Sequence, residues 1–336
     1  MKHFPPRTAA HSIAERVRWL AAVLIGVLPS FSWACATCGC TLSTDAAMGY
    51  SAAAGWRINF EYDYLNQDQL RSGTHAVSGV PDGNELEHDT INRYLTLGVT
   101  YSPNPDWNIT VRIPYVSRDH TTYGDFDSTQ PLPQLSGSHS SSLGDVKLIG
   151  GYQGFLPTHN LGIQLGVKLP TGGYGTDVNF NSGPNAGTPL DASLQPGTGS
   201  TDLIVGGYYY QAVSQNWDVF ANGTFQAAVT GRQDQPDNDF RPGNQINVSF
   251  GLRYEANPRI VPQLQVNLLR KSPDQGALAD AEGTAGTVAY VGPGLIVSVL
   301  HDLQLYGFVQ VPVYSQLNGY QLFPRWTGSL GVSYAF

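Results

Sequence analysis

Residues 56–65 read WRINFEYDYL and alternate between two kinds of side chain at every position. One face would carry Trp56, Ile58, Phe60, Tyr62 and Tyr64, and the other Arg57, Asn59, Glu61 and Asp63. Successive side chains of a β-strand point to opposite faces, so this stretch predicts a strand with one apolar and one polar face. Its length matches the roughly ten residues with which a tilted strand crosses a bilayer. We therefore expect a membrane-spanning strand with its apolar face toward lipid.

The same pattern recurs along the chain. Candidate strands lie near 56–65, 91–102, 106–116, 143–154, 160–170, 202–212, 216–228, 246–255, 259–268, 287–299, 302–313 and 326–336. The count is about twelve, and single-chain bacterial barrels have an even number of strands. The connections alternate between short ones and long ones, the latter near 66–90, 117–142, 171–201, 229–245, 269–286 and 314–325. The pattern predicts an all-β fold, a transmembrane antiparallel up-and-down β-barrel over 56–336, with short periplasmic turns, long extracellular loops and both termini in the periplasm.

Composition agrees with a membrane barrel. Charged residues make up only 13% of the chain, against about 25% in soluble domains, yet the mean hydropathy is slightly polar at −0.19. Alternating lipid-facing and lumen-facing residues explain both values. A soluble β-sandwich is the alternative for alternating strands, but it does not explain apolar residues along the outer face of every strand. The formal net charge of −8 argues against nucleic-acid binding, which needs a basic surface.

Residues 1–34 have the layout of a secretory signal peptide. Basic residues from Lys2 to Arg18 precede a short apolar run at 19–28, and Ser32 and Ala34 are the small residues of a cleavage site. The apolar run is too short for a transmembrane helix, which needs about 20 residues. We expect export, an outer-membrane location in a Gram-negative bacterium, and a periplasmic segment at 35–55 that forms either a linker or a short helix closing the periplasmic mouth.

All three cysteines of the chain, Cys35, Cys38 and Cys40, fall in that segment. Four interpretations stay open for them: a disulfide with one spare thiol, a thiolate site for copper or zinc, a redox contact with a periplasmic protein, and lipidation of Cys35. No other cofactor is expected. Haem attachment needs C-x-x-C-H, and Thr41 follows Cys40 instead.

Charged residues on the polar faces are candidates for a constriction inside the barrel. Those expected in the lumen are Arg57, Glu61, Arg112, Lys147, Lys168, Asp218 and Arg253, together with Asp63 and Asp145. Five cations against four anions are close to balance, so the wall as a whole predicts no strong ion selectivity, which would require rings of one sign. Arg112 and Glu61 lie nearest mid-height. The alternative is that these charges pair with one another and only stabilise the wall.

The chain carries no signature of an enzyme. His120, His139 and His159 are expected in loops or a turn, and no serine lies beside them in a nucleophile motif. His75 and His88 fall in an acidic first loop with Glu85 and Glu87, which we interpret as a solvated loop rather than a cation site. No phosphate-binding loop is present.

Aromatic residues complete the pattern. Trp56, Trp107, Trp217 and Trp326 are placed at strand ends on the apolar face, where aromatic girdles meet the lipid headgroups of the outer membrane. The chain ends on Phe336, which resembles the C-terminal signal by which the barrel-assembly machinery recognises its substrates.

Several stretches resemble one family. They are CGCTL (38–42), FEYDYLNQDQLRSG (60–73), LGDVKLIGGYQ (143–153), GVKLPTGGY (166–174), PGTGSTD (196–202), YGFVQVPVYSQLNGYQL (306–322) and GSLGVSYAF (328–336). Together they are similar to the outer-membrane barrels grouped as meta-pathway phenol-degradation proteins, and the resemblance covers most of residues 38–336. It implies an outer-membrane channel or facilitator for a small, aromatic or apolar solute.

Two other functions remain open. In one, the barrel is a structural or redox partner whose cysteine-rich N-terminus engages a periplasmic protein or metal. In the other, it is a membrane hydrolase, which the absence of a nucleophile motif disfavours.

Overall fold

The computed structural model describes residues 54–175, 177–230 and 239–336. The cysteines, the predicted signal peptide and nearly all of the 35–55 segment lie outside these residues. The strands are β1 (Gly55–Gly73), β2 (His75–Ala76), β3 (Glu85–Asn104), β4 (Trp107–Asp125), β5 (Ser136–Leu143), β6 (Lys147–Tyr152), β7 (Leu161–Lys168), β8 (Thr201–Ala212), β9 (Trp217–Thr230), β10 (Gln245–Tyr254), β11 (Ile260–Lys271), β12 (Gly286–Ser298) and β13 (Leu303–Ala335). Within the described residues, the only helix is the single 3-10 turn η1 (Ala192–Leu194), and no helix is long and apolar enough to cross a membrane.

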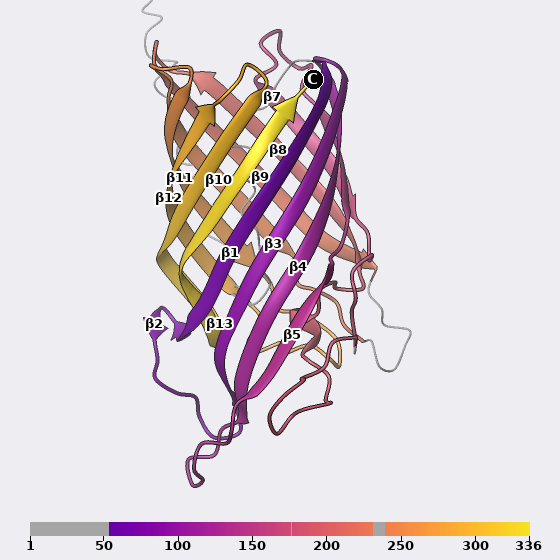
Figure 1. Cartoon of the computed structure of the whole chain (residues 1–336), viewed down its shortest axis with the longest axis vertical. Coiled ribbons are helices and arrows are strands. Elements are labelled where there is room, and N and C mark those ends of the chain that lie inside the picture. Colours follow the sequence, from indigo (N-terminus) through magenta and orange to yellow (C-terminus); the bar gives the residue numbers. More distant parts are fainter. Residues whose placement is uncertain (1–53, 176, 231–238) are drawn as a thin grey trace, which may run out of the picture. The chain divides into compact units, whose positions relative to one another are not determined.

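The strands form a closed antiparallel barrel (Figure 1). In the described residues, eleven strand elements pair in chain order from β1 to β13, with β2 and β5 outside this path, and β13 pairs with β1 to close the wall. Closure leaves no unpaired edge along the paired part of the wall, which is the condition for a sheet to lie in lipid. The predicted all-β antiparallel barrel is confirmed.

The long element β13 crosses the wall twice. Residues 304–317 pair with β12, whereas residues 317–335 pair with β1. The Ala335 N–H donates to the Asp302 carbonyl over 2.9 Å, so the two ends of the element lie side by side. The chain reverses near Gly319, whose φ of 51° lies in the left-handed region that glycine adopts without strain. The described wall therefore has twelve crossings, as the sequence pattern predicts.

Side chains alternate between the lipid side and the lumen along each strand. In β11, residues 260–268 are alternately exposed and buried: Ile260, Leu264 and Val266 face outward, whereas Gln263 and Gln265 face the lumen. This is the reverse of a soluble protein, in which the apolar face is buried. An apolar outer surface is what the predicted contact with lipid requires.

Aromatic pairs mark two levels on the outer wall. At the end where both ends of the described chain lie, ring pairs join Trp56 to Tyr101, Trp107 to Tyr152 and Trp217 to Tyr254, with centroids 4.6–4.8 Å apart. Toward the other end, Tyr64 lies 5.6 Å from Trp326. The eight residues from Trp56 to Tyr64 span about 20 Å along the barrel axis for a tilted strand. We call these two levels the lower and upper girdles.

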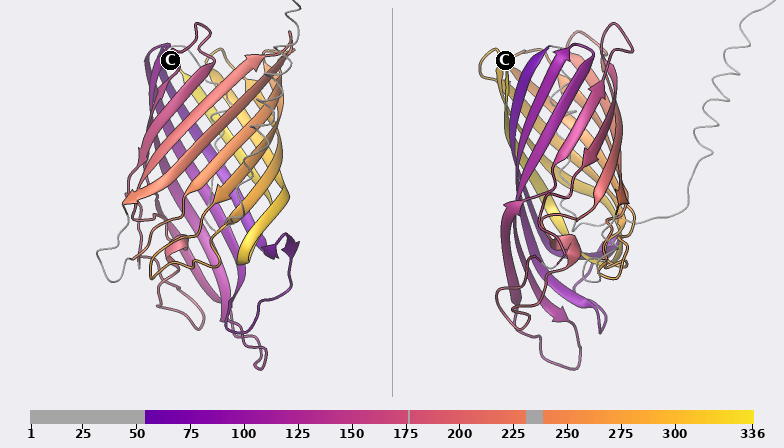
Figure 2. Two further views of the ribbon diagram at one scale, coloured as in Figure 1. Left: turned by 180° about the vertical axis from the view of Figure 1, so that it is seen from behind. Right: turned by 90° about the vertical axis from the view of Figure 1, so that its right-hand side faces the viewer.

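Strands on one side of the barrel continue well past the upper girdle. β1, β3 and β4 are 19–20 residues long, and β5 extends the wall beside β4. Figures 1 and 2 draw the barrel with the lower girdle at the top, beside the end marked C, so this one-sided extension points to the bottom of each view. The predictions of loops at 66–90 and 117–142 are therefore wrong in part, and 314–325 lies within β13. The outward residues of the extension, such as Asp119 and Thr121, are polar, so the apolar alternation ends there while the hydrogen-bonded ladder continues.

Candidate functional site in the barrel lumen

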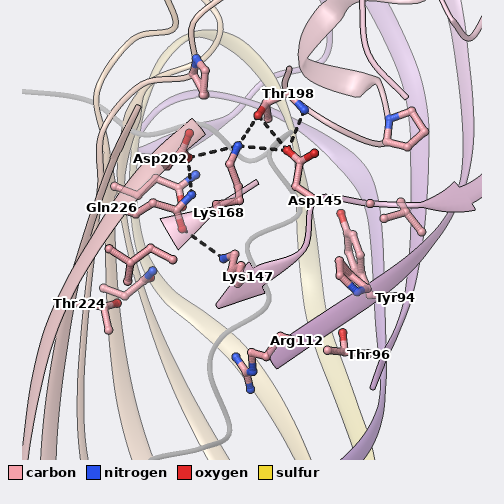
Figure 3. A pocket seen from close by; sticks show the side chains of 18 of the residues that line it. Tyr94, Thr96, Arg112, Asp145, Lys147, Lys168, Thr198, Asp202, Thr224 and Gln226 are labelled. Carbon is pink, nitrogen blue, oxygen red and sulfur yellow. Dashed lines mark hydrogen bonds and ion pairs between the residues drawn. The ribbon is translucent and has the colours of Figure 1, made fainter. Parts of the chain in front are cut away.

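A cavity of about 240 Å³ lies inside the barrel at and above mid-height. Its wall comes from inward residues of β3, β4, β6, β7, β8, β9 and β10, from Gly144 and Asp145 between β5 and β6, and from parts of two connections that fold into the lumen, within 193–198 and 240–243. Figure 3 shows charged side chains from several of these strands converging on one space. The long connection after β7 therefore forms part of the lumen wall.

Cations outnumber anions around this cavity. The cationic lining residues are Arg112, Arg118, Lys147 and Lys168, and the anionic ones are Asp145 and Asp202. The sequence predicted nearly equal numbers of cations and anions along the whole height of the wall. At the level of the cavity the numbers are not equal. A local excess of positive charge in a narrow space raises the concentration of anions there.

A chain of polar contacts connects most of these charges. Lys168 Nζ lies 3.1 Å from Asp145 Oδ2 and 3.2 Å from Asp202 Oδ2, and all three side chains are almost fully buried. Gln226 donates to Asp202 over 2.6 Å and accepts from Lys147 Nζ over 3.1 Å. These contacts hold Lys147, Lys168, Asp145 and Asp202 in fixed positions on the cavity wall (Figure 3).

Arg118 occupies the upper part of the cavity. Its Nε donates to Asn92 over 2.5 Å, one terminal nitrogen donates to the Tyr94 hydroxyl over 3.2 Å, and the other donates to the Leu194 carbonyl. The side chain is buried. β4 places Arg118 two residues beyond Val116 on the lumen face. Arg118 thus joins the wall to the connection after β7.

Apolar and aromatic groups make up the rest of the lining. They include Val116, Ile149, Ile204, Phe240 and the ring of Tyr94. An apolar wall beside fixed polar groups is the usual composition of small-molecule sites. The cavity therefore offers both a cationic and an apolar surface to a solute.

The sequence-predicted lumen residues divide into two groups. Arg112, Lys147 and Lys168 line the cavity, together with Asp145. Glu61 and Asp63 also face the lumen but do not line the cavity. The Tyr306 hydroxyl donates to Glu61 over 2.9 Å, and the Ser329 hydroxyl donates to Asp63 over 2.5 Å.

The other three predicted lumen residues, Arg57, Asp218 and Arg253, lie close to the lower girdle. Arg57 pairs with Ala335, and Asp218 is the cross-strand partner of Arg253, whose guanidinium is 2.9 Å from Glu255. These residues belong to the lower rim and not to the cavity.

Sequence reasoning missed Arg118, Tyr94, Asp202 and Gln226 as lining residues. Arg118 fell within the predicted loop 117–142, although the inward positions Val116, Arg118 and His120 continue one alternation. His120 and His139 are therefore on strands β4 and β5 and not in loops, whereas His159 lies in a turn as expected. His88 lies on β3 and His75 on β2 rather than in an open loop.

Among the described residues, no group of three or more His, Cys, Asp or Glu side chains could hold a metal ion. The predicted site at Cys35, Cys38 and Cys40 lies outside them, so it stays a prediction. Phe336 is exposed, and its backbone pairs with that of Trp56; its role in assembly is likewise a prediction.

One solved structure supports the fold, and two others are less similar. The COG4313 outer membrane channel from Pseudomonas putida F1 matches with a TM-score of 0.61 at 14% identity, over 88% of this chain and all of that one. The toluene transporter TbuX of Ralstonia pickettii matches with a TM-score of 0.44 at 10% identity, over 90% of this chain and 97% of that one. The CymD monoaromatic hydrocarbon channel matches with a TM-score of 0.43 at 10% identity, over 84% of this chain and 89% of that one.

These three solved structures are described as channels or transporters. None of the curated proteins matches the chain. A family model described as "Putative MetA-pathway of phenol degradation" matches residues 113–326, which is more than half of the sequence. The chain belongs to this family of phenol-degradation-pathway barrels.

Proposed function

We propose that this protein is an outer-membrane channel for a small solute that combines an aromatic or apolar body with an anionic group. The observation that carries the proposal is the cavity in the lumen of a closed barrel, where cations exceed anions beside an apolar surface. A twelve-crossing wall is intermediate between filled eight-stranded barrels and wide sixteen-stranded pores. A lumen of this size suits one small molecule.

The chemistry of the lining explains the preference for an anion. Arginine and lysine form charge-assisted hydrogen bonds with carboxylates, and arginine can do so with two parallel bonds. Arg112 and Lys147 are direct cross-strand partners on β4 and β6, so both side chains can bind the same anionic group. Ile149 and Ile204 provide contact for an apolar body nearby.

The two aromatic girdles support a proposed position of the barrel in the membrane. Both ends of the described chain lie at the lower girdle, and the long polar strand extensions lie beyond the upper one. Outer-membrane barrels have short periplasmic turns and long extracellular segments. The proposed orientation therefore puts both termini in the periplasm and the extensions outside the cell.

Swelling of proteoliposomes in matched solutes tests the proposal. Benzoate, benzyl alcohol and benzylamine share one ring and differ in charge, so their relative rates report the contribution of the cations. We expect benzoate to enter fastest, and the double variant Arg112→Gln/Lys147→Gln to lose this preference while still admitting benzyl alcohol. Equal rates for all three solutes in the unmodified protein would refute the anionic part of the proposal. No swelling with any solute would refute the channel.

A metal- or redox-partner role for Cys35, Cys38 and Cys40 stays a separate proposal, because these residues lie outside the described part of the chain. Contacts with outer-membrane lipid and with the barrel-assembly machinery are further proposals. They follow from the apolar outer wall and from the terminal Phe336.

A further inference from the structure

The connection between β7 and β8 places a short non-strand segment inside the lumen. Residues 190–198 (LDASLQPGT), called here the inner segment, include η1. Leu190, Leu194 and Gln195 are each at most 4% exposed, and Ser193, Gln195, Pro196 and Thr198 line the cavity. Loops usually run over a protein surface because their backbone groups need partners, so this inward position requires specific anchors.

The first anchor is Arg118 on β4. It donates to the backbone carbonyl of Leu194, next to the centre of the inner segment, while its other nitrogens hold Asn92 and Tyr94 on the wall. A carbonyl that loses this donor would stay buried without a partner, which is unfavourable. Arg118 thus fixes the segment through its backbone, and the contact does not depend on the identity of the side chain at 194.

The second anchor is Asp145, in the break between β5 and β6. Its Oδ2 accepts from the Thr198 backbone N–H over 3.0 Å and from the Thr198 hydroxyl over 2.9 Å. Its Oδ1 accepts from Gly172 N–H over 3.1 Å. One carboxylate therefore holds both ends of the connection, one near Gly172 and the other near Thr198. Lys168 Nζ lies 3.1 Å from the same carboxylate and balances its charge.

The inner segment also has internal packing that keeps it as one unit. Leu190 and Leu194 form an apolar cluster with Phe180 from the same connection. The amide of Gln195 donates to the carbonyls of Leu190 and Val178 and accepts from Val178 N–H. These contacts are within the connection, so loss of an anchor to the wall would move the segment as a body and leave its own fold intact.

We infer that the inner segment is the selectivity element of the channel, and that Arg118 and Asp145 are the positioning residues that set its distance from the cationic wall. This inference rests on the proposed channel function. It assigns the aperture of the cavity to a segment that is held by side chains of the wall, Arg118 and Asp145 among them. Widening the aperture would raise conductance and weaken discrimination between small and larger anions.

Single-channel recording of variants in planar bilayers tests the inference. Arg118→Ala removes the first anchor, and Thr198→Val removes the hydroxyl bond of the second anchor while keeping the bond from the Thr198 backbone N–H. We expect both to raise conductance above that of the unmodified protein, with Arg118→Ala showing the larger increase and more frequent flickering. Arg118→Lys keeps a cation that can reach the Leu194 carbonyl, but it loses the rigid set of donors of the guanidinium. We therefore expect this variant to have a conductance close to that of the unmodified protein.

A matched control is Arg325→Ala, which removes an arginine that forms an ion pair with Asp68 on the outside of the wall over 3.1 Å. This variant should conduct like the unmodified protein. If folded, heat-modifiable Arg118→Ala and Thr198→Val also conduct like the unmodified protein, the inference is wrong while the channel stands. If the unmodified protein and all variants are silent, both the channel and the inference are wrong.

A second readout follows the segment itself. In a background with Cys35, Cys38 and Cys40 changed to serine, Ser193→Cys reports access of a water-soluble thiol reagent to the inner segment. Adding Arg118→Ala should accelerate modification several-fold, whereas adding Arg325→Ala should not. Equal modification rates in the two double variants would show that Arg118 does not hold the segment.

Discussion

Several large aromatic side chains in the lower lumen pack against a glycine of the neighbouring strand. Phe220 faces Gly251, Tyr208 faces Gly162 and Phe308 faces Gly294 as direct cross-strand partners. A Cβ added to any of these glycines would lie 2.1–2.3 Å from ring atoms. Tyr306 covers Gly331 in the same way. The rings fill the lower lumen only because the facing residue has no side chain.

Gly251→Ala should therefore destabilise the barrel. Overpacking of this kind costs about 1–3 kcal/mol, because Phe220 must leave its rotamer and disturb the cluster with Ile296 and Phe308. Denaturant unfolding in lipid vesicles would measure the loss. Gly98→Ala is the control, since its added Cβ would meet its nearest neighbour at an ordinary 3.5 Å. An equal loss in both variants would refute the packing explanation, and Phe220→Leu should rescue Gly251→Ala.

At the level of elements, the sequence pattern predicts strands wherever lipid contacts the outer face. Between the girdles, apolar and polar residues must alternate, so β8 to β12 were placed within a few residues of their observed bounds. Above the upper girdle both faces are polar, so apolar and polar residues no longer alternate, although the strands remain hydrogen-bonded to one another. The extensions of β1, β3 and β4 therefore could not be found by that signal.

The absence of an alternating pattern also limited the prediction of the candidate site. Arg112, Lys147 and Lys168 could be assigned to the lumen because each lies on the polar face of an alternating strand. Arg118 could not, because it lies in an extension, and the inner segment could not, because a connection rich in Gly, Pro and Asn carries no periodicity that shows whether it folds inward. Its position depends on long-range contacts with Arg118 and Asp145.

The extension of β3 meets the connection after β7 at a set of acidic groups outside the membrane-spanning part. Burial, with Asp191 nearby, raises the pKa of Glu85 to about 7. Burial, with Glu85 and Asp191 nearby, raises the pKa of Glu87 to about 8. Burial and Asp280 also raise the pKa of Asp191. On the other side of the connection, burial and Arg118 lower the pKa of His120 to about 4; its ring lies 6.0 Å from that of Phe180.

These shifts predict opposite pH effects on how firmly the connection is held. Because the folded state favours protonated Glu85 and Glu87, its stability falls as the pH rises from the ordinary carboxyl value to about 8. Because it favours neutral His120, its stability falls as the pH drops from the ordinary histidine value to about 4. Hydrogen exchange of residues 190–198 across pH 4–9 would show both effects. Glu87→Gln should weaken the alkaline effect, and His120→Asn should remove the acid one; unchanged profiles would contradict the assignment.

At the scale of the whole molecule, the apolar outer wall between the girdles determines where the barrel resides. Leu264, in the middle of β11, is exposed on that wall. Leu264→Arg should lower stability in bilayers by about 2–4 kcal/mol, the cost of a cation near the bilayer midplane. Thr121→Arg, on the outer face of β4 above the upper girdle, should cost little. Equal effects of the two substitutions would mean that the membrane does not lie between the girdles.

The wall and its lumen together give the central claim, which is that this barrel conducts small anions through a cationic cavity. The most direct test is single-channel recording of the purified, heat-modifiable protein in a planar bilayer under a salt gradient. The account predicts discrete openings with a reversal potential on the side of anion permeation, because Arg112, Arg118, Lys147 and Lys168 outnumber Asp145 and Asp202 around the cavity. A folded barrel that stays silent, or one that prefers cations, would contradict it.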